Sequence, residues 1–330
     1  MKKILVLRFS SIGDIVLTSP ILRALKTQLN CEVHFLTKTS FLPLVAHNPY
    51  LSKVITFTKD IDEVVDELKG EQYDFVVDLH HNLRTFRLKR MLKRPSAAFP
   101  KLNVRKYLYV RFKMNVMPDV HIVDRYFEAV QTLGVQNDGM GLDYFIPQEE
   151  EIDINDFLPA PFQNGYVAIA LGAQFTTKRL PFEKLRQLVS GITQPVVLLG
   201  GKEDAETGKK LRELDPTRIF NAAGCCSLNQ SASLVKQAAC LITHDTGLMH
   251  IGSAFKKDIL SIWGNTTPQL GMYPYLPSKN SQQFEVQNLS CRPCSKIGHE
   301  QCPKGHFKCM EEQDVDGIVS AIVKTQQTNG

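Results

Sequence analysis

The chain has 330 residues, which is too long for one ordinary hydrophobic core and predicts two domains of about 150 residues each. Hydrophobic residues make up 43% and charged residues 22%, as in soluble globular proteins, and no apolar run approaches the roughly 18 residues of a membrane span. The opening MKKILVLRFSSIGD has a short apolar run that Arg8 and Asp14 interrupt. It predicts a first strand rather than a signal peptide, so we expect a cytoplasmic protein.

The net charge of +5 is concentrated in one part of the chain. The segment from Arg84 to Lys113 carries eleven basic residues and no acidic one, and without these charges the rest of the chain would be acidic. Such a concentration predicts a localised anionic partner. A solvated basic surface and a nucleic-acid site are the alternatives. The basic residues are not accompanied by a pattern of aromatic residues for base stacking or by a known RNA-binding motif.

The first half of the chain alternates strand-like and helix-like segments. This alternation predicts a parallel sheet that is covered by helices on both faces. The polar, acidic segment 136–163 is rich in Pro and Gly and predicts a linker. The expected strands are 3–8, 32–37, 53–57 and 73–80, and the expected helices are 14–28, 60–70 and 122–133.

The same alternation starts again after the linker and continues to an amphipathic C-terminal helix. We therefore expect an α/β fold with two doubly wound, Rossmann-like domains that face a central ligand cleft. The expected domains are 1–155 and 156–310, and a C-terminal helix and tail over 311–330 returns to the first domain. The expected strands are 166–172, 195–201, 218–224, 240–244 and 258–264; the expected helices are 181–190, 203–214, 228–238, one from Thr246, and one with Val315, Ile318, Val319, Ile322 and Val323 on one face.

The stretch THDTGLMHIGSAF (243–255) places Asp245 at a strand end and begins a helix at Thr246 and Gly247. The free N–H groups and the dipole at a helix start favour an anion such as a diphosphate. Gly247 permits that anion to approach the backbone closely. The simpler alternative is a helix that Asp245 or Thr246 caps.

Two further strand ends carry charged residues. In GAQFTTKRLP (172–181), Lys178 or Arg179 could neutralise a diphosphate leaving group, or the loop is merely solvated. In GGKEDAE (200–206), the acids could accept hydrogen bonds from ribose hydroxyls, or they only complement a helix dipole.

The first strand leads into SSIGDIVLTSP, in which Gly13 precedes Asp14. The sequence motifs of dinucleotide-binding loops (G-x-G-x-x-G) and phosphate-binding loops (G-x-x-x-x-G-K) are absent from it. A carboxylate at this strand end repels phosphate, so we expect the phosphates to bind in the other domain. Asp14 could instead accept a proton from a hydroxyl nucleophile, or it is only a stabilising acid in the first helical turn.

Four of the eight cysteines cluster near the C-terminus with the spacing C-x2-C-x7-C-x6-C. Four thiolates could hold a structural zinc, but the second pair lacks the C-x2-C spacing of a zinc ribbon. Reduced thiols in a packed loop, without a metal, are the alternative that we favour. The four residues are Cys291, Cys294, Cys302 and Cys309.

LRFSSIGDIVLTSPILRALK (7–26) and HDTGLMHIGSAF (244–255) together resemble glycosyltransferase family nine, the bacterial heptosyltransferases of lipopolysaccharide core synthesis. The resemblance covers essentially the whole chain and includes the lysine loop and the cysteine-rich segment. It implies a GT-B fold and an inverting transfer from a nucleotide sugar, usually ADP-heptose, to an anionic lipid-linked inner-core acceptor. It also implies peripheral contact with the inner face of the inner membrane and no cofactor besides the nucleotide-sugar co-substrate.

The resemblance also implies roles for individual residues. Asp14 matches the catalytic base of the family, and Lys178 matches the lysine that meets the donor diphosphate. Asp204 falls near the ribose-binding acid, although Glu203 and Glu206 blur this match. The implied donor-binding residues are Lys178, Asp204, Ser227, Asp245, Thr246, Gly247, Leu248 and His250. The acceptor-binding residues that we expect are Ser11, Gly13, His81, Arg84, Arg87 and Arg90.

Two alternatives to this function stay open from the sequence. One is a nucleotide-sugar epimerase of GT-B fold, which needs no lipid acceptor. The other is a non-catalytic protein that binds an anionic surface or nucleic acid through the basic segment. The preferred prediction has no nucleic-acid partner and leaves the oligomeric state and the identity of the sugar open.

Overall fold

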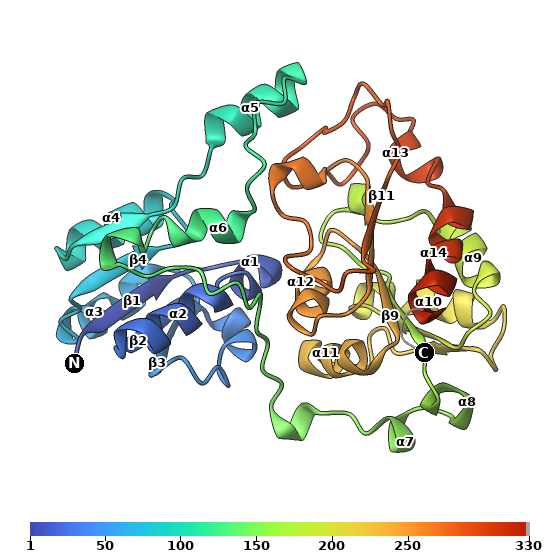
Figure 1. Ribbon diagram of the computed structural model, residues 1–330, viewed down its shortest axis with the longest axis horizontal. Helices are drawn as coiled ribbons and strands as arrows, with labels where there is room; N and C mark the ends of the chain where they lie inside the picture. Colours follow the sequence, from blue (N-terminus) through green and yellow to red (C-terminus); the bar gives the residue numbers. More distant parts are fainter. Residues whose placement is uncertain (328–330) are drawn as a thin grey trace. The chain divides into compact units, whose positions relative to one another are not determined.

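A computed structural model describes residues 1–327, with side chains described as far as Ile322. The chain divides into two compact units. The first unit contains Met1–Lys101 and Val120–Phe145. The second contains Leu102–Asp119 and the chain from Ile146 onward. Each unit is built around one parallel sheet (Figure 1).

The sheet of the first unit has the order β3-β2-β1-β4-β5, and all of its strand pairs are parallel. A parallel pair needs a crossover connection, and helices provide it. The strands are β1 (Lys3–Leu7), β2 (Glu32–Lys38), β3 (Lys53–Phe57), β4 (Phe75–Asp78) and β5 (Ser96–Ala98); the helices are α1 (Ile12–Val16), α2 (Ser19–Leu29), α3 (Val65–Gly70), α4 (Leu83–Leu92) and α6 (Ile122–Phe127).

The single helix expected over 14–28 is instead two helices, α1 and α2. Pro20 lies in the first turn of α2, where its missing N–H is tolerated, so a new helix begins at this point. The Thr18 hydroxyl donates to the Ile15 carbonyl over 2.7 Å and closes the short connection. On one face of the sheet, α3 and α4 bury residues such as Leu68 and Leu88 against strand residues such as Leu5.

The sheet of the second unit has the order β11-β10-β9-β6-β7-β8 and is also parallel throughout. Helix α5 (Asn103–Phe112) belongs to this unit although it precedes the strands in the chain. The strands are β6 (Val167–Ala170), β7 (Val196–Leu199), β8 (Ile219–Asn221), β9 (Cys240–His244), β10 (Ile259–Trp263) and β11 (Gln282–Glu285); the helices are α7 (Ile154–Phe157), α8 (Ala160–Gln163), α9 (Phe182–Gly191), α10 (Ala205–Arg212), α11 (Leu228–Gln237), α12 (Gly247–Ala254), α13 (Lys308–Glu311) and α14 (Val315–Gln327).

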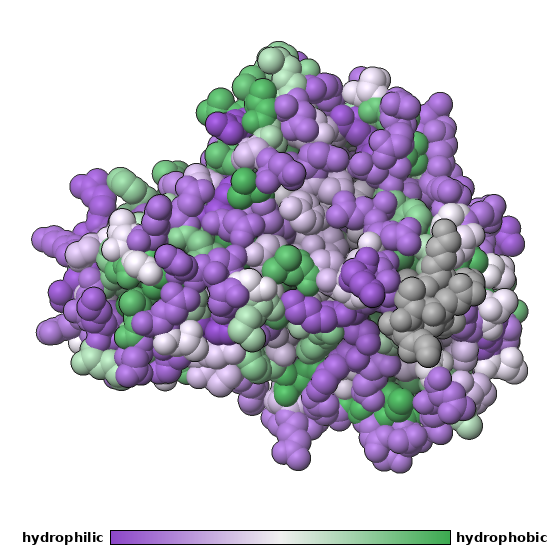
Figure 2. All heavy atoms as spheres, in the orientation of Figure 1, coloured by the Kyte–Doolittle hydropathy of each residue, from purple (hydrophilic) through white to green (hydrophobic). Residues whose placement is uncertain are grey.

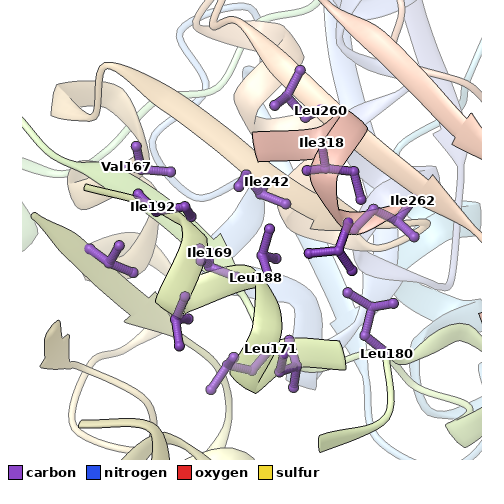
Figure 3. Close-up of a cluster of buried hydrophobic side chains, with 14 of the residues drawn as sticks. Val167, Ile169, Leu171, Leu180, Leu188, Ile192, Ile242, Leu260, Ile262 and Ile318 are labelled. Carbon is purple, nitrogen blue, oxygen red and sulfur yellow. The ribbon is translucent and has the colours of Figure 1, made fainter. Parts of the chain in front are cut away.

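Side chains that alternate along the strands of the second unit form a core on each face of the sheet. Ile169 and Ile242 pack with α9 and α14 on one face (Figure 3). Ala168 and Leu241 pack with α11 on the other. These strands are buried on both faces, which explains their continuous apolar runs and fixes the positions of the loops at their carboxyl ends.

The structure differs from the expected domains in three places. Leu102–Asp119 belongs to the second unit, although the first domain was expected to cover 1–155 without a break. The segment around Ile152 packs on the second unit, where its N–H donates to the Ser233 hydroxyl over 2.9 Å, so the change of unit comes before residue 155. The expectation that the C-terminal helix returns to the first domain is wrong for the described residues. Ile318 and Ile322 of α14 are buried in the core beside α9, because they supply the apolar stripe that covers this face.

No helix within residues 1–327 combines the length and the apolar character that crossing a membrane requires. The expected helical face near the C-terminus is described as far as Ile322, and the side chain of Val323 lies outside the described residues.

Candidate active site

The first candidate residues lie where β1 ends in the first unit. The chain leaves β1 with Arg8, whose side chain is only 9% exposed. Its Nη2 lies 2.6 Å from Asp14 Oδ1, and its Nε donates to the Ser10 carbonyl over 2.8 Å. Its Nη1 donates to the Tyr126 hydroxyl over 3.0 Å and to the Leu79 carbonyl. Arg8 therefore ties the Asp14 carboxylate to the ends of β1 and β4 and to α6.

The Asp14 carboxylate remains 19% exposed at the start of α1. Its Oδ2 accepts hydrogen bonds from the backbone N–H and the hydroxyl of Ser11 over 3.3 and 2.9 Å, and Gly13 beside it is buried. Burial alone raises the pKa of this carboxyl, but Arg8 and Ser11 outweigh burial and hold the pKa below its ordinary value of 3.8. Asp14 is therefore ionised at neutral pH and has lone pairs for a hydroxyl donor.

The end of β4 lies next to the end of β1 in the same sheet. Asp78 is fully buried there, and its Oδ1 accepts the N–H groups of His80 and His81 over 3.1 and 2.6 Å. Its other oxygen lies 2.8 Å from Lys89 Nζ. Burial lowers the pKa of the His80 imidazole to about 4. A neutral imidazole and an ionised Asp14 therefore occupy neighbouring strand ends.

The predicted acceptor arginines lie on α4. Arg84, Arg87 and Arg90 recur at three-residue intervals and are all exposed. Arg87 Nη2 lies 2.5 Å from Asp62 Oδ2, and the Arg90 guanidinium lies 5.9 Å from the centre of the Phe86 ring. Folding thus brings an acid from a distant part of the chain to one of these arginines, although the basic segment itself contains none.

His81 is the residue of the acceptor set that precedes α4. It is exposed, its backbone has a left-handed φ of 50°, and its Nδ1 lies 2.9 Å from the Phe99 carbonyl oxygen. Ser11, Gly13 and Asp14 are brought together at the start of α1, and His81 lies at the start of the neighbouring α4. The arginines extend from there along α4.

In the second unit, the lysine loop after β6 meets the end of β9. Lys178 Nζ lies 2.6 Å from Asp245 Oδ2 and donates to the Asp245 carbonyl over 3.3 Å. Thr266, which follows β10, donates its hydroxyl to Asp245 Oδ2 over 3.0 Å. Strands β6, β9 and β10 are neighbours, so residues from three strand ends converge at the carboxyl edge of one sheet.

Helix α12 begins at this edge without a side-chain cap. Thr246 occupies the N-cap position, but its hydroxyl accepts no bond from the helix; it lies 3.2 Å from the Thr243 hydroxyl. Asp245 is engaged with Lys178 and Thr266 and does not cap the helix. The sequence left open whether this helix start is an anion site or is capped by Asp245 or Thr246. The structure shows no such side-chain cap. The N–H groups of the first turn therefore remain available to an anion beside a lysine.

The acid predicted to bind ribose is enclosed. Asp204 is 4% exposed; its Oδ1 lies 3.1 Å from Arg179 Nη1, and its Oδ2 accepts the Gly201 N–H over 2.9 Å. Burial raises the pKa of Asp204 in spite of these partners. A side chain at Gly172 would collide with the carboxylate, so the glycine at the end of β6 makes room for this acid.

The remaining donor residues lie at the starts of α11 and α12. Ser227 caps α11, where its hydroxyl accepts the Gln230 N–H over 3.1 Å and contacts the Glu150 carboxylate. Leu248 is half-buried on α12, and His250 is buried two residues later. The structure therefore gathers Lys178 and residues 245–247 closely, whereas Asp204 and Ser227 belong to other strand and helix ends of the same sheet.

Sequence reasoning missed Arg8, His244 and Thr266. His244 is buried at the end of β9, where its Nε2 accepts the Leu180 N–H over 3.0 Å and burial lowers its pKa to about 4. An isolated arginine directly after an apolar strand was a detectable signal for Arg8, because a buried guanidinium needs acidic or carbonyl partners. Nothing in the local sequence pointed to Thr266, whose role depends on strand order.

The four C-terminal cysteines do not form a metal-ligand set. Among the described residues, no three His, Cys, Asp or Glu side chains gather in an arrangement that could hold a metal ion. Cys294 instead donates to the Cys291 carbonyl over 3.1 Å, and Cys291 Sγ lies 3.8 Å from His306 Nε2. All are free thiols, and Cys309 is buried in the core.

Comparison with known proteins identifies the family of this chain. Residues 61–305 match the family described as glycosyltransferase family 9 (heptosyltransferase). The chain belongs to glycosyltransferase family 9. This glycosyltransferase is 23% identical over 305 residues to the lipooligosaccharide heptosyltransferase 2 of Haemophilus influenzae, and the match covers 81% of this chain and 84% of the relative.

Solved structures share the fold of this glycosyltransferase. A family 9 glycosyltransferase from Veillonella parvula superposes with a TM-score of 0.78 at 21% identity and covers 98% of this chain and 97% of its own. The ADP-heptose lipopolysaccharide heptosyltransferase II of Escherichia coli superposes with a TM-score of 0.71 at 17% identity, covering 99% and 100%. The predicted α/β fold of GT-B type, with two parallel-sheet domains, is confirmed.

Proposed function

We propose that this glycosyltransferase moves a heptose from ADP-heptose to an anionic saccharide of the lipopolysaccharide inner core, with inversion at the anomeric carbon. Its family and the names of its relatives support the sugar and the class of acceptor. The observation that carries the proposal is the start of α12, where an uncapped helix N-terminus lies beside Lys178. Both features favour the diphosphate of a nucleotide sugar, which is the co-substrate in this proposal.

The donor diphosphate would meet the Lys178 cation and the N–H groups of Gly247 and Leu248. Asp245 neutralises Lys178 at 2.6 Å, so the lysine is already held at the strand edge. As the bond to the sugar breaks, negative charge grows on the leaving diphosphate, and a fixed cation stabilises that charge. Ser227 and Asp204 are the proposed neighbours of the adenosine, from the starts of α11 and α10.

Asp14 would act on the acceptor hydroxyl. Its carboxylate is ionised and partly exposed, and Arg8 and Ser11 fix its orientation. A positioned carboxylate takes the proton as the hydroxyl oxygen bonds to the anomeric carbon, when the acidity of the hydroxyl has risen. Ser11, Gly13 and His81 are the proposed neighbours of the acceptor saccharide at this sheet edge.

The arginines of α4 would bind the acidic groups of the acceptor. Arg84 and Arg90 are the stronger candidates, because Arg87 is paired with Asp62 at 2.5 Å. Phosphate and carboxylate groups match the planar fork of a guanidinium. We also propose that the enzyme acts in the cytoplasm in peripheral contact with the inner membrane, because its acceptor is lipid-linked in this proposal.

A product assay tests the proposed function. The enzyme is incubated with ADP-heptose, UDP-glucose or ADP-glucose and with a heptose-free lipopolysaccharide precursor, and the products are analysed by mass spectrometry. We expect the acceptor to gain one heptose from ADP-heptose and nothing from the other donors. Transfer from UDP-glucose or ADP-glucose alone would overturn the proposal that heptose is the transferred sugar. An epimerised nucleotide sugar without a glycosylated acceptor would overturn the proposal that the enzyme is a transferase. The Lys209→Ala variant, which changes an exposed lysine of α10, serves as a control that keeps full activity.

A further inference from the structure

Helix α5 has no buried residue, although it is three turns long. Val104, Tyr107 and Phe112 are 72%, 60% and 57% exposed. The apolar exposure continues past the helix, at Met114 and Val116. Most short helices are stabilised by packing an apolar face on a core, and a helix of this length is marginal alone in water. The outward apolar side chains of α5 therefore lack the partner that such a sequence normally has.

One side of α5 is anchored to the second unit. Lys113 ends the helix, and its ammonium donates to the Cys291 carbonyl over 2.9 Å and to the Pro293 carbonyl over 2.6 Å. Tyr109 lines an open cavity of about 390 Å³, together with the loop after β11 and with Thr267 and Gln269, which follow β10. The helix is therefore held at its C-terminal end and along the side of Tyr109, and its opposite side is left outward.

The outward side combines apolar and basic residues in helical register. Val104, Tyr107, Leu108 and Arg111 follow the i, i+3, i+4, i+7 spacing of one helix face. The rings of Tyr107 and Phe112 contact edge to face, with centroids 6.0 Å apart. Figure 2 shows hydrophobic side chains gathered at the top of the view, over α5, with hydrophilic ones between them.

The segment that carries this face has charges of one sign. The segment 101–118 carries five basic residues and no acidic one. Within the described part of the chain, neither Arg105 nor Arg111 forms an ion pair, whereas Arg87 of α4 pairs with Asp62. Outward aromatic and aliphatic side chains flanked by unpaired arginines are the composition of a helix that lies in a membrane interface.

We propose that α5, with Met114 and Val116, docks the enzyme on the surface of an anionic phospholipid bilayer. The inference deepens the proposed function and rests on it only for the lipid-linked nature of the acceptor. The apolar side chains would enter the boundary between head groups and acyl chains, and Arg105 and Arg111 would meet the lipid phosphates. Lys113 takes no part in the lipid contact, because backbone carbonyls already occupy its donors.

Vesicle co-sedimentation tests the proposal without any acceptor. The full-length enzyme is mixed with vesicles of phosphatidylcholine alone or with 30% phosphatidylglycerol, roughly the anionic content that gives cytoplasmic leaflets their surface potential. We expect partition to the anionic vesicles and a strong decrease with added salt. The Arg105→Ala/Arg111→Ala variant should bind the anionic vesicles roughly tenfold or more weakly than the wild type does. The Tyr107→Ser/Phe112→Ser variant should lose a comparable factor of affinity for neutral and for anionic vesicles.

Matched changes elsewhere in the second unit provide the controls. Lys209→Ala/Lys210→Ala removes two exposed cations of α10, and Leu214→Ser removes an exposed apolar side chain that follows it. Both controls should sediment as the wild type does, and circular dichroism should show equal melting for all variants. Wild-type binding by the α5 variants would overturn the proposal. So would equal binding to neutral and anionic vesicles, vesicle binding only when lipopolysaccharide precursor is added, or an α5-dependent change of oligomeric state without vesicle binding.

Activity separates this inference from the proposed function. With a deacylated, water-soluble acceptor, Tyr107→Ser/Phe112→Ser should keep the wild-type rate; with the acceptor embedded in anionic vesicles, its rate should fall about as much as its vesicle binding. An equal rate loss on both acceptors would overturn a docking role. If neither acceptor yields product, the proposed function fails, while the sedimentation result still decides the membrane contact.

Discussion

In the first unit β1 leads into α1, and in the second unit β9 leads into α12; both connections lie at the carboxyl edge of a parallel sheet. The start of α1 carries its own carboxylate, Asp14, which Arg8 and Ser11 hold in place. The start of α12 has no side-chain cap, and Lys178 lies beside it. The same backbone plan thus repels an anion at one edge and attracts it at the other. In the proposed function, the residue types around the helix start, rather than the fold, distinguish the proton acceptor of one unit from the diphosphate site of the other.

The largest effect should come from removing the carboxylate of the first edge. The Asp14→Asn variant keeps the shape of the side chain but cannot accept the proton, so we expect kcat to fall about 10²- to 10⁴-fold. Steady-state transfer measurements with ADP-heptose check this. The matched change Asp66→Asn alters a fully exposed acid and should leave kcat unchanged. A wild-type kcat for Asp14→Asn would contradict the role of Asp14 as the catalytic base.

Removing the cation of the second edge should have the next largest effect. In Lys178→Ala the leaving diphosphate loses its fixed cation and meets the unneutralised Asp245, so kcat/KM should fall about 10²- to 10³-fold. Adding Asp245→Asn should recover part of this loss, because it removes the repulsion and leaves only the missing cation. If the double variant is no better than Lys178→Ala, Asp245 has no electrostatic influence on the donor.

One substitution would give the start of α12 an acidic residue, as the start of α1 has in Asp14. Thr246→Asp would give α12 an acidic N-cap, which should stabilise the unliganded enzyme by about 0.5 kcal/mol. The same carboxylate would occupy the N–H groups and repel the diphosphate, so ADP should bind roughly tenfold more weakly. A thermal melt and a calorimetric titration give the two values. A variant that is more stable and binds ADP as the wild type does would contradict an anion site at this helix start.

The smallest effect near neutral pH should come from the partner of Asp14. Arg8 and Ser11 hold the pKa of Asp14 below 3.8, so lowering the pH from 7 to 5 should cost the wild type no activity through this group. In Arg8→Met the effect of burial remains without the guanidinium, so the pKa of Asp14 should rise above its wild-type value. The acid limb of kcat/KM against pH should move upward by the same amount. An unmoved limb in a folded variant would mean that Arg8 does not set the protonation of Asp14.

The sequence was sufficient for nine of the described strands and for the start of α12, because apolar runs and turn residues are local. The short edge strands β5 and β11 were not predicted, because their partly exposed residues form no apolar run. It could not reveal that Thr266 reaches Asp245 or that Asp62 reaches Arg87, since these contacts depend on strand order and helix packing. The C-terminal helix was assigned to the wrong domain for a similar reason. Its apolar stripe specifies a buried face, but either core could accept Ile318 and Ile322.

Calorimetric titration of ADP into Asp14→Asn and Lys178→Ala, side by side with the wild type, tests the division of roles most directly. The account predicts that Asp14→Asn binds ADP with the wild-type Kd, whereas Lys178→Ala binds it roughly tenfold or more weakly. The reverse order, or a loss of ADP binding in Asp14→Asn alone, would contradict the assignment of the diphosphate to the second unit.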